Sequence, residues 1–356
     1  MPSSAVYSGV ESFRDNDELT EVTFAKGVTT IGEDAFRGCS SLAAIIIPDG
    51  VTSIGDSAFG KCSSLAAITI PDSVTMIGNH AFRECSSLAA ITIPASVATI
   101  GNYAFLLCSS LAAITIPDGV TTIGNSTFQR CSSLAAITIP DTVTTIDFGA
   151  FWGCSSLTAI TIPDGVTTIG NRAFLVCSSL EAIIIPNGVT IIGSGVFRGC
   201  SSLAAITIPN GVTSIGNSAF SQCSSLAAIT IPDSVTSIGI AAFYGCSALM
   251  TLSLSPAVSI GNDCFLDCTA LISAAAAQNM LTVEDLLHSR WHRIRERVAV
   301  LSCLKTPWND DLENQPRSDT PEQNSHLDGD EVVALQGIKA RKRLPKVMWR
   351  VILEFL

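Results

Sequence analysis

The chain has 356 residues, of which 47% are hydrophobic and 14% are charged, a composition that suffices for a large buried core and argues against disorder over most of the length. The formal net charge of −11 is uneven, because residues 1–272 hold 8 Lys and Arg against 19 Asp and Glu, whereas residues 273–356 hold 12 of each. An acidic surface repels phosphate backbones, so we expect no nucleic-acid partner.

The amino terminus lacks both the basic start and the apolar stretch that a secretory signal needs. The sequence contains no uninterrupted apolar run of about 18 residues, the minimum for a membrane-spanning helix, so we expect no integral membrane span. Together these features predict an intracellular protein with a cytoplasmic or nuclear location.

Phenylalanine recurs every 23 residues and divides most of the chain into about twelve similar units. The recurring residues are Phe13, Phe36, Phe59, Phe82, Phe105, Phe128, Phe151, Phe174, Phe197, Phe220 and Phe243, with Phe265 following after a single deletion. Tandem repeats of this length are typical of solenoids, in which each unit buries the apolar face of its neighbour. We therefore assign residues 1–272 to one repeat domain.

The unit from residue 58 to residue 80 illustrates the local pattern. Leu65, Ile68 and Ile70 predict a short strand that carries Ala67 and Thr69 on its opposite face. Proline then removes a backbone donor, and the following Asp-Ser pair favours a turn.

A second extended piece follows at residues 74–77. Gly78 closes it, and we expect this glycine to supply a positive φ. Residues 79–84 are too few for a packed helix, which predicts a turn or a single helical coil with Phe82 pointing inward.

The recurring Leu, Ile, Pro, Val, Ile-Gly, Ala-Phe and Cys resemble the 23-residue leucine-rich repeats of the BspA-like type, over about residues 10–272. The resemblance implies a mainly β, right-handed solenoid that binds proteins or surfaces, and it implies no reaction. Departures are local: Asn16 replaces Cys in the first unit, Asp147 replaces Gly in the sixth, and Ser255-Pro256 shifts the last proline. The first and last of these predict caps at the open ends of the stack.

Ten of the 13 cysteines, from Cys39 to Cys246, share the repeat spacing. They are predicted to form one column of buried, reduced thiols, since parallel side chains on neighbouring turns fit disulfide geometry poorly. Cys264 and Cys268 lack a second ligand pair, and the four histidines are scattered, so we predict neither a metal site nor a catalytic set. We expect no cofactor and no enzymatic activity.

Two surfaces are alternative binding faces. Ala and Thr repeat along the strand, as at Ala67 and Thr69, and a second threonine column includes Thr75. Regular packing explains both columns, although a flat threonine lattice also suits an ice-binding array. The residues beside each Ala-Phe pair vary instead, through drift in exposed turns or because aromatic and Arg side chains there anchor a protein partner. The candidate protein-binding residues are Arg130, Trp152, Arg172 and Tyr244.

The period stops after Leu271, and three further segments follow. Residues 273–304 predict a helical cap on the last repeat, because an N-cap threonine precedes an apolar stripe at helical spacing. Residues 305–332, rich in Pro, Asp, Asn and Ser, predict a flexible linker. Residues 333–356 predict a basic amphipathic helix.

The terminal helix carries a short resemblance to the first helix of an F-box, at Leu344-Pro345, Ile352-Leu353 and Leu356. The resemblance implies recruitment of a ubiquitin ligase, but the further helices of an F-box are absent from the sequence. Docking on the solenoid, anchoring at a membrane surface and recognition by an import receptor are alternatives. The candidate docking residues are Trp349, Ile352 and Phe355.

These features predict a non-enzymatic protein-protein interaction scaffold built on leucine-rich repeats. One alternative is a substrate adaptor of a ubiquitin ligase, in which the repeats select the target and the terminal helix recruits the machinery. The other is a surface-adhesion or ice-binding array. Nearly identical repeats carry little information about a partner, so the sequence does not identify it.

Overall fold

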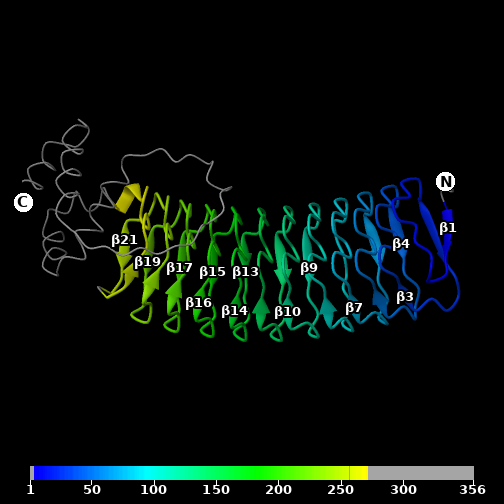
Figure 1. The fold of residues 1–356 in the computed structure, drawn as a ribbon, viewed down its shortest axis with the longest axis horizontal. Helices are drawn as coiled ribbons and strands as arrows, with labels where there is room; N and C mark the ends of the chain where they lie inside the picture. The colour runs from blue at the N-terminus through cyan, green and yellow to red at the C-terminus, as the bar shows by residue number, and fades with distance from the viewer. Residues whose placement is uncertain (1–3, 256, 272–356) are drawn as a thin grey trace, which may run out of the picture. The chain divides into compact units, whose positions relative to one another are not determined.

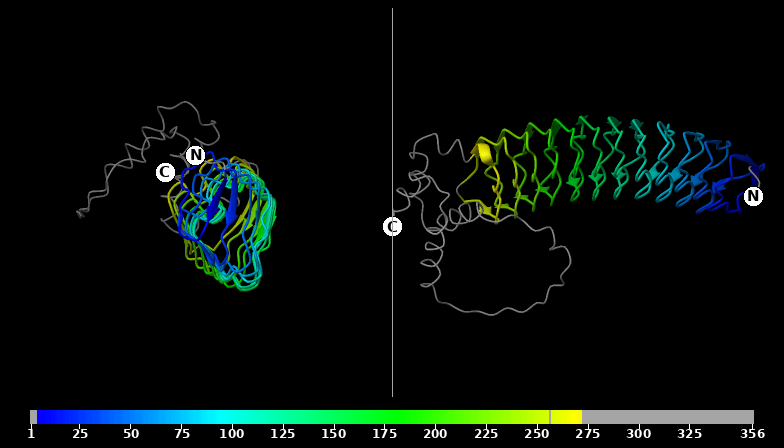
Figure 2. Two further views of the ribbon diagram at one scale, coloured as in Figure 1. Left: turned by 90° about the vertical axis from the view of Figure 1, so that its right-hand side faces the viewer. Right: turned by 90° about the horizontal axis from the view of Figure 1, so that it is seen from above.

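The computed structural model describes residues 4–255 and 257–271. Within them the chain forms a mainly β solenoid of about ten turns at 23-residue spacing, which confirms the predicted mainly β solenoid and its period. Successive turns follow one another along a single axis (Figure 1), and the end-on view nearly superposes them around a shared interior (Figure 2). The predicted helical cap at 273–304, the linker at 305–332 and the helix at 333–356 lie outside the described residues.

The strands fall into two columns of parallel neighbours. The first column contains β1 (Ser4–Tyr7), β2 (Glu21–Phe24), β4 (Ala44–Ile46), β6 (Ala67–Thr69), β9 (Ala113–Thr115), β11 (Ala136–Thr138), β13 (Ala159–Ile160), β15 (Ala182–Ile184), β17 (Ala205–Thr207), β19 (Ala228–Thr230) and β21 (Thr251–Ser253). The second contains β3 (Thr30–Ile31), β5 (Ser53–Ile54), β7 (Met76–Ile77), β8 (Thr99–Ile100), β10 (Thr122–Ile123), β12 (Thr145–Ile146), β14 (Thr168–Ile169), β16 (Ile191–Ile192), β18 (Ser214–Ile215), β20 (Ser237–Ile238) and β22 (Ser259–Ile260).

The register places equivalent residues of neighbouring turns beside each other. In the first column Ala44 pairs with Ala67, and in the second Thr122 pairs with Thr145, each 23 residues on. A fixed 23-residue register therefore stacks the equivalent positions of successive repeats into columns.

Phenylalanine forms the central column of the core. The rings from Phe36 to Phe243 are fully buried. Neighbouring rings from Phe13 to Phe265 stack with centroids 5.2 to 5.7 Å apart and interplanar angles of at most 18°. Aromatic pairs at this separation contribute about 0.5–1.5 kcal/mol beyond the area that they bury. The inward orientation predicted for Phe82 is confirmed.

The cysteine column completes the hydrogen bonding of the phenylalanine backbone. The carbonyl oxygen of Phe36 accepts the N–H of Cys39 at 3.1 Å and the thiol of Cys62, one turn on, at 3.0 Å. Later turns repeat the thiol contact as far as Cys268. All cysteines in the described ranges are buried and none is paired with another, which confirms the predicted buried column, while their reduced state stays a prediction.

A shortened unit closes the amino-terminal end of the stack. Strand β1 pairs with β2 only 17 residues later, with Ser4 opposite Glu21. The buried Tyr7 ring lies 5.1 Å from that of Phe36, and its hydroxyl accepts the N–H of Gly32 at 2.7 Å. An aromatic ring with a polar tip thus covers the first regular turn, as the predicted amino-terminal cap requires.

The role predicted for Gly78 is wrong. Its φ is not positive, and the positive φ falls two residues later at His80, with a value of 56°. A Cβ at Gly78 would lie 2.5 Å from Asp56 Oδ1 and 2.6 Å from the carbonyl carbon of Gly55. Glycine is required here because the backbones of neighbouring turns approach too closely for a side chain.

Burial of the thiols makes the fold sensitive to alkali. Burial raises the pKa of Cys131 from its ordinary value of 9.0 to about 12. Above pH 9 the unfolded chain loses this proton while the folded chain keeps it, so the unfolded state binds fewer protons and the free energy of unfolding falls as pH rises. Each such thiol should remove about 1.4 kcal/mol per pH unit until the folded pKa is reached.

We expect reversible urea unfolding in the presence of a reductant to show this fall between about pH 9 and pH 11. In Cys131→Ala the free energy of unfolding should fall less steeply with pH than in the unmodified chain, by the contribution of one proton. The difference between the two slopes separates this thiol from other groups that titrate at alkaline pH. Identical slopes for the two proteins would show that Cys131 is not a protonated core thiol.

Candidate functional site

The variable side chains project from one repeated segment, which we call the turn face. It comprises the six residues from three before to two after each column phenylalanine, as in residues 79–84. Its backbone is fixed by hydrogen bonds to the next turn, from Ser57 N to Asn79 O at 2.8 Å and from Lys61 N to Arg83 O at 2.6 Å. Because these bonds use only backbone atoms, the side chains of the turn face are free to vary.

Two positions of each turn face adopt a positive φ. In successive units they include Lys61 at 63° and His80 at 56°, and glycine takes them only in some units, as at Gly149 and Gly153. Non-glycine residues adopt this conformation infrequently, and tertiary hydrogen bonds hold it where it occurs. The fold therefore tolerates side chains at positions where local preference alone favours glycine.

Three of the four predicted binding residues lie in consecutive units. Arg130, Trp152 and Arg172 lie on the turn faces of three consecutive units. Tyr244 lies three units beyond Arg172, and its hydroxyl is hydrogen-bonded to Asp267 on the next turn. Desolvation together with that carboxylate raises the pKa of Tyr244. Tyr244 therefore belongs to a different part of the surface.

Small residues make room for the large ones in this group. A Cβ at Gly153 would lie 3.3 Å from Arg130 Cγ, and one at Gly149 would lie 3.7 Å from Trp152 Cε3. Gly153 therefore leaves space for the stem of Arg130, whereas a side chain at Gly149 would meet the indole of Trp152 at ordinary contact distance. The Arg130 N–H also donates to the Trp152 carbonyl oxygen at 2.6 Å.

A residue that was not predicted, Phe148, completes the group. The Arg172 guanidinium carbon lies 5.7 Å from the Phe148 ring centroid, within the range of a cation–π interaction worth about 0.5–1 kcal/mol at exposed sites. Phe148 is 38% exposed. We refer to Arg130, Phe148, Trp152, Arg172 and Val176 as the Arg172 cluster.

Phe148 occupies a position that asparagine fills in neighbouring units. There the side chain accepts a backbone N–H of the next turn, as from Asn102 N to Asn79 Oδ1 at 2.9 Å and from Asn125 N to Asn102 Oδ1 at 2.7 Å. A phenyl ring offers no acceptor to the N–H of Asn171. The interrupted asparagine column was a sequence signal that could have identified Phe148.

Val176 also departs from the preference of its position. It adopts a φ of 58°, where Gly153 and Gly199 in the neighbouring units have 74°. A β-branched residue with a positive φ is strained, yet Val176 remains 45% exposed. Residues that lower local stability concentrate at functional sites. Val176 lies in the same unit as Arg172, and Phe148 lies in the preceding unit.

The two threonine columns differ in how their hydroxyls are used. In the column that contains Thr75, directly before the strands of the second column, hydroxyls bond to the preceding turn, as from Thr75 Oγ1 to the carbonyl oxygen of Thr52 at 3.2 Å. In the first column Thr69, Thr138 and their equivalents are exposed, and their hydroxyls make no hydrogen bond to the described residues. Structural bonding therefore explains the second column, while the first forms a polar surface without large side chains.

The remaining predictions concern metal binding, membrane spans and the carboxy-terminal docking residues. Among residues 4–255 and 257–271, no group of three or more His, Cys, Asp or Glu side chains is placed to hold a metal ion. No helix in the same ranges is long and apolar enough to cross a bilayer. The predicted docking residues Trp349, Ile352 and Phe355, and the F-box-like segment with them, lie outside the described part of the chain.

The repeats are similar to those of a known family and of several solved structures. A family model described as a BspA type leucine rich repeat region of six copies matches residues 8–134, 98–226 and 167–294. A solved leucine-rich repeat protein from Bacteroides ovatus is 30% identical, with coverage of 75% of this chain and 85% of that chain and a TM-score of 0.55. No curated protein matches the chain.

Two further solved structures are similar. A leucine rich cell surface protein from Faecalibacterium prausnitzii is 32% identical, covering 76% of this chain and 86% of that one, with a TM-score of 0.48. A leucine-rich repeat protein from Eubacterium ventriosum is 25% identical, covering 74% and 90%, with a TM-score of 0.49. The predicted intracellular location gains no support from these likenesses.

Replacing Phe148 with asparagine tests whether this residue stabilises the core or belongs only to the exposed surface. The Phe148→Asn variant restores the acceptor for the N–H of Asn171, a bond worth about 0.5–1.5 kcal/mol, and it loses the contact with Arg172, worth about 0.5–1 kcal/mol. Since the two terms nearly cancel, we expect the free energy of unfolding to change by less than about 1 kcal/mol in urea denaturation. A loss as large as that of a buried aromatic, about 3–5 kcal/mol, would make Phe148 a core residue instead.

Proposed function

We propose that this chain, which belongs to the BspA type leucine-rich repeat family, is a non-enzymatic scaffold that binds a protein partner at the Arg172 cluster. The observation that supports the proposal is that Arg130, Trp152 and Arg172 lie on the turn faces of consecutive units, with Arg172 over the ring of a partly exposed Phe148. Protein interfaces concentrate their energy in a few aromatic and Arg side chains. The proposed scaffold has twelve right-handed repeats and a helical cap at residues 273–304.

The cluster is arranged so that little order has to be created on binding. The Phe148 ring contacts the Arg172 guanidinium, and backbone hydrogen bonds fix the backbone of Trp152. Immobilising a flexible side chain costs about 0.5–1.5 kcal/mol at an interface. A surface that is already ordered retains more of its contact energy as affinity.

The first strand column supports the proposal by contrast. Its exposed surface is built from Ala and Thr, which are poor anchors for a protein interface. Its threonine column is also interrupted by isoleucine at Ile46 and Ile184, which are 73% and 79% exposed. These interruptions break the continuous hydroxyl lattice that an ice-binding surface would use, and they favour the turn face as the binding site.

Affinity capture with single-residue variants of the full chain tests the proposal. For a partner retained by the unmodified protein, Trp152→Ala should weaken binding by at least about 1 kcal/mol, roughly five-fold, because it removes an aromatic anchor. Thr138→Ala, the matched change on the strand surface, should have a much smaller effect. Quantitative mass spectrometry of the retained proteins, followed by titration of the partner, measures both.

The opposite ranking of the two variants would place the contact on the strand surface and favour a flat ligand. A third variant, Trp349→Ala, examines the predicted terminal docking helix. If binding falls only in Trp349→Ala, the repeats do not provide the primary contact, and the ligase-adaptor alternative gains support.

A further inference from the structure

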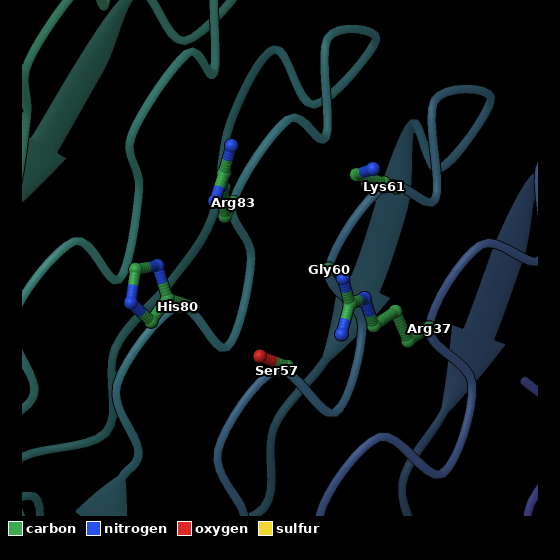
Figure 3. Close-up of a pocket in the computed structure, with 6 residues that line it drawn as sticks. All are labelled: Arg37, Ser57, Gly60, Lys61, His80 and Arg83. Atoms are coloured by element: carbon green, nitrogen blue, oxygen red, sulfur yellow. The ribbon is translucent and has the colours of Figure 1, made fainter.

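A notch interrupts the turn face in the third unit. At the position directly after the column phenylalanine, Gly60 stands between Arg37 of the preceding turn and Arg83 of the following one (Figure 3). The missing side chain leaves a cavity of about 200 Å³. Its lining residues are Arg37, Ser57, Gly60, Lys61, His80 and Arg83.

The backbone does not require glycine at this position. Gly60 has no positive φ, and its N–H bonds to Ser57 O at 2.9 Å as the N–H of Arg83 bonds to His80 O at 3.0 Å. A Cβ would approach only the carbonyl oxygen of Ser57 closely, at 3.3 Å. Since equivalent residues with long side chains adopt the same turn, the glycine serves to keep the notch open.

The lining is rich in cations and contains no carboxylate. Arg37 Nη1 lies 3.3 Å from Asp34 Oδ1, but the same carboxylate also binds Arg14 at 3.0 Å. Arg83 pairs with Glu84 at 2.8 Å. Lys61 makes no ion pair with any residue in the described ranges. The positive charge facing the notch is therefore only partly neutralised.

The other lining groups add hydrogen-bond donors in fixed positions. The Ser57 hydroxyl makes no hydrogen bond within the described part of the chain and lies at the lower edge of the notch in Figure 3. The His80 ring stacks on Tyr103, with centroids 4.6 Å apart and planes 1° from parallel. Burial lowers the pKa of His80, and the nearby Arg83 charge lowers it further. A neutral imidazole in this place still carries one N–H donor.

The arrangement suits a compact anion whose acceptors point in several directions. Two guanidinium groups flank the notch from opposite sides, and an ammonium group lies at its rim (Figure 3). Tetrahedral oxyanions with two charges fit such donors better than a planar carboxylate, because each cation can meet a different oxygen.

We propose that the Gly60 notch binds a dianionic phosphate group through Arg37, Lys61 and Arg83. The site is separate from the Arg172 cluster, which lies several turns further along, and it does not depend on that cluster having a protein partner. Free phosphate and the phosphate of a phosphorylated side chain share this chemistry. Binding of one small group is consistent with the acidic character of the array as a whole, which repels long polyanions.

Isothermal titration calorimetry of the full chain tests the proposal with inorganic phosphate, with O-phosphoserine and with acetate as a monoanionic control. We expect phosphate to bind and acetate to bind at least about ten-fold more weakly. Tighter binding of O-phosphoserine would assign a phosphorylated side chain as the ligand, and tighter binding of inorganic phosphate would assign the free ion. Absence of measurable binding by both would overturn the proposal.

Two variants distinguish a shaped site from general attraction. Gly60→Gln fills the notch without changing the charge, and Gln129 occupies the equivalent position elsewhere, so the fold should accept it. Lys61→Gly removes a cation at a position where Gly38 has the same positive φ. Each should weaken phosphate binding at least about ten-fold.

The matched control is Arg198→Ala, which removes a cation from the same column as Gly60 but several turns away. It should leave phosphate affinity unchanged. If Gly60→Gln binds phosphate as the unmodified chain does, or if Arg198→Ala weakens binding as much as Lys61→Gly, the attraction is diffuse and no notch site exists.

Discussion

Each column phenylalanine is packed between the rings of its two neighbours, and one 23-residue unit cannot provide this contact by itself. Phe128, for example, lies 5.5 Å from Phe105 and 5.6 Å from Phe151 between ring centroids. Burial of every unit therefore depends on the next, and the stability of the array is shared between neighbours. At the amino-terminal end, where no further unit is available, the ring of Tyr7 covers the stack.

The repeat period predicted the core more successfully than the local backbone. The spacing of Phe, Cys, Leu and Ile identified the buried columns, because burial is a property of position within the unit. The close approach at Gly78, the positive φ of His80 and the bond from a thiol to a phenylalanine carbonyl were not predicted. These features depend on how far apart neighbouring turns lie and which atoms then meet, and a sequence does not contain that distance.

The candidate site shows a similar division. Residue type and position in the repeat selected Arg130, Trp152 and Arg172, which lie on consecutive turns, whereas Tyr244 lies three turns beyond Arg172. Phe148 belongs to the variable residues beside the Ala-Phe pairs, but it was not among the predicted binding residues because the asparagine bonding that it interrupts is seen only in the structure. The Gly60 notch was also overlooked, since a glycine in a turn is ordinarily explained by conformation.

The hydrogen-bonding pattern explains how one regular fold can carry distinct sites. Backbone bonds between turns hold the turn face, so side chains there can change without loss of the core. A large residue such as Phe148 and a missing side chain at Gly60 are both accepted by this scaffold. Specificity can therefore arise from single substitutions against a uniform background.

Hydrogen exchange across the phenylalanine column tests whether stability is in fact shared between neighbouring turns. In Phe128→Ala the loss of one ring should cost about 3–5 kcal/mol. It should reduce amide protection not only in its own turn but also at Phe105 and Phe151, whose N–H groups donate to neighbouring turns at 2.9 and 2.8 Å. Protection at Phe220, several turns away, should fall less. A loss confined to the Phe128 turn, with Phe105 and Phe151 unchanged, would contradict this account.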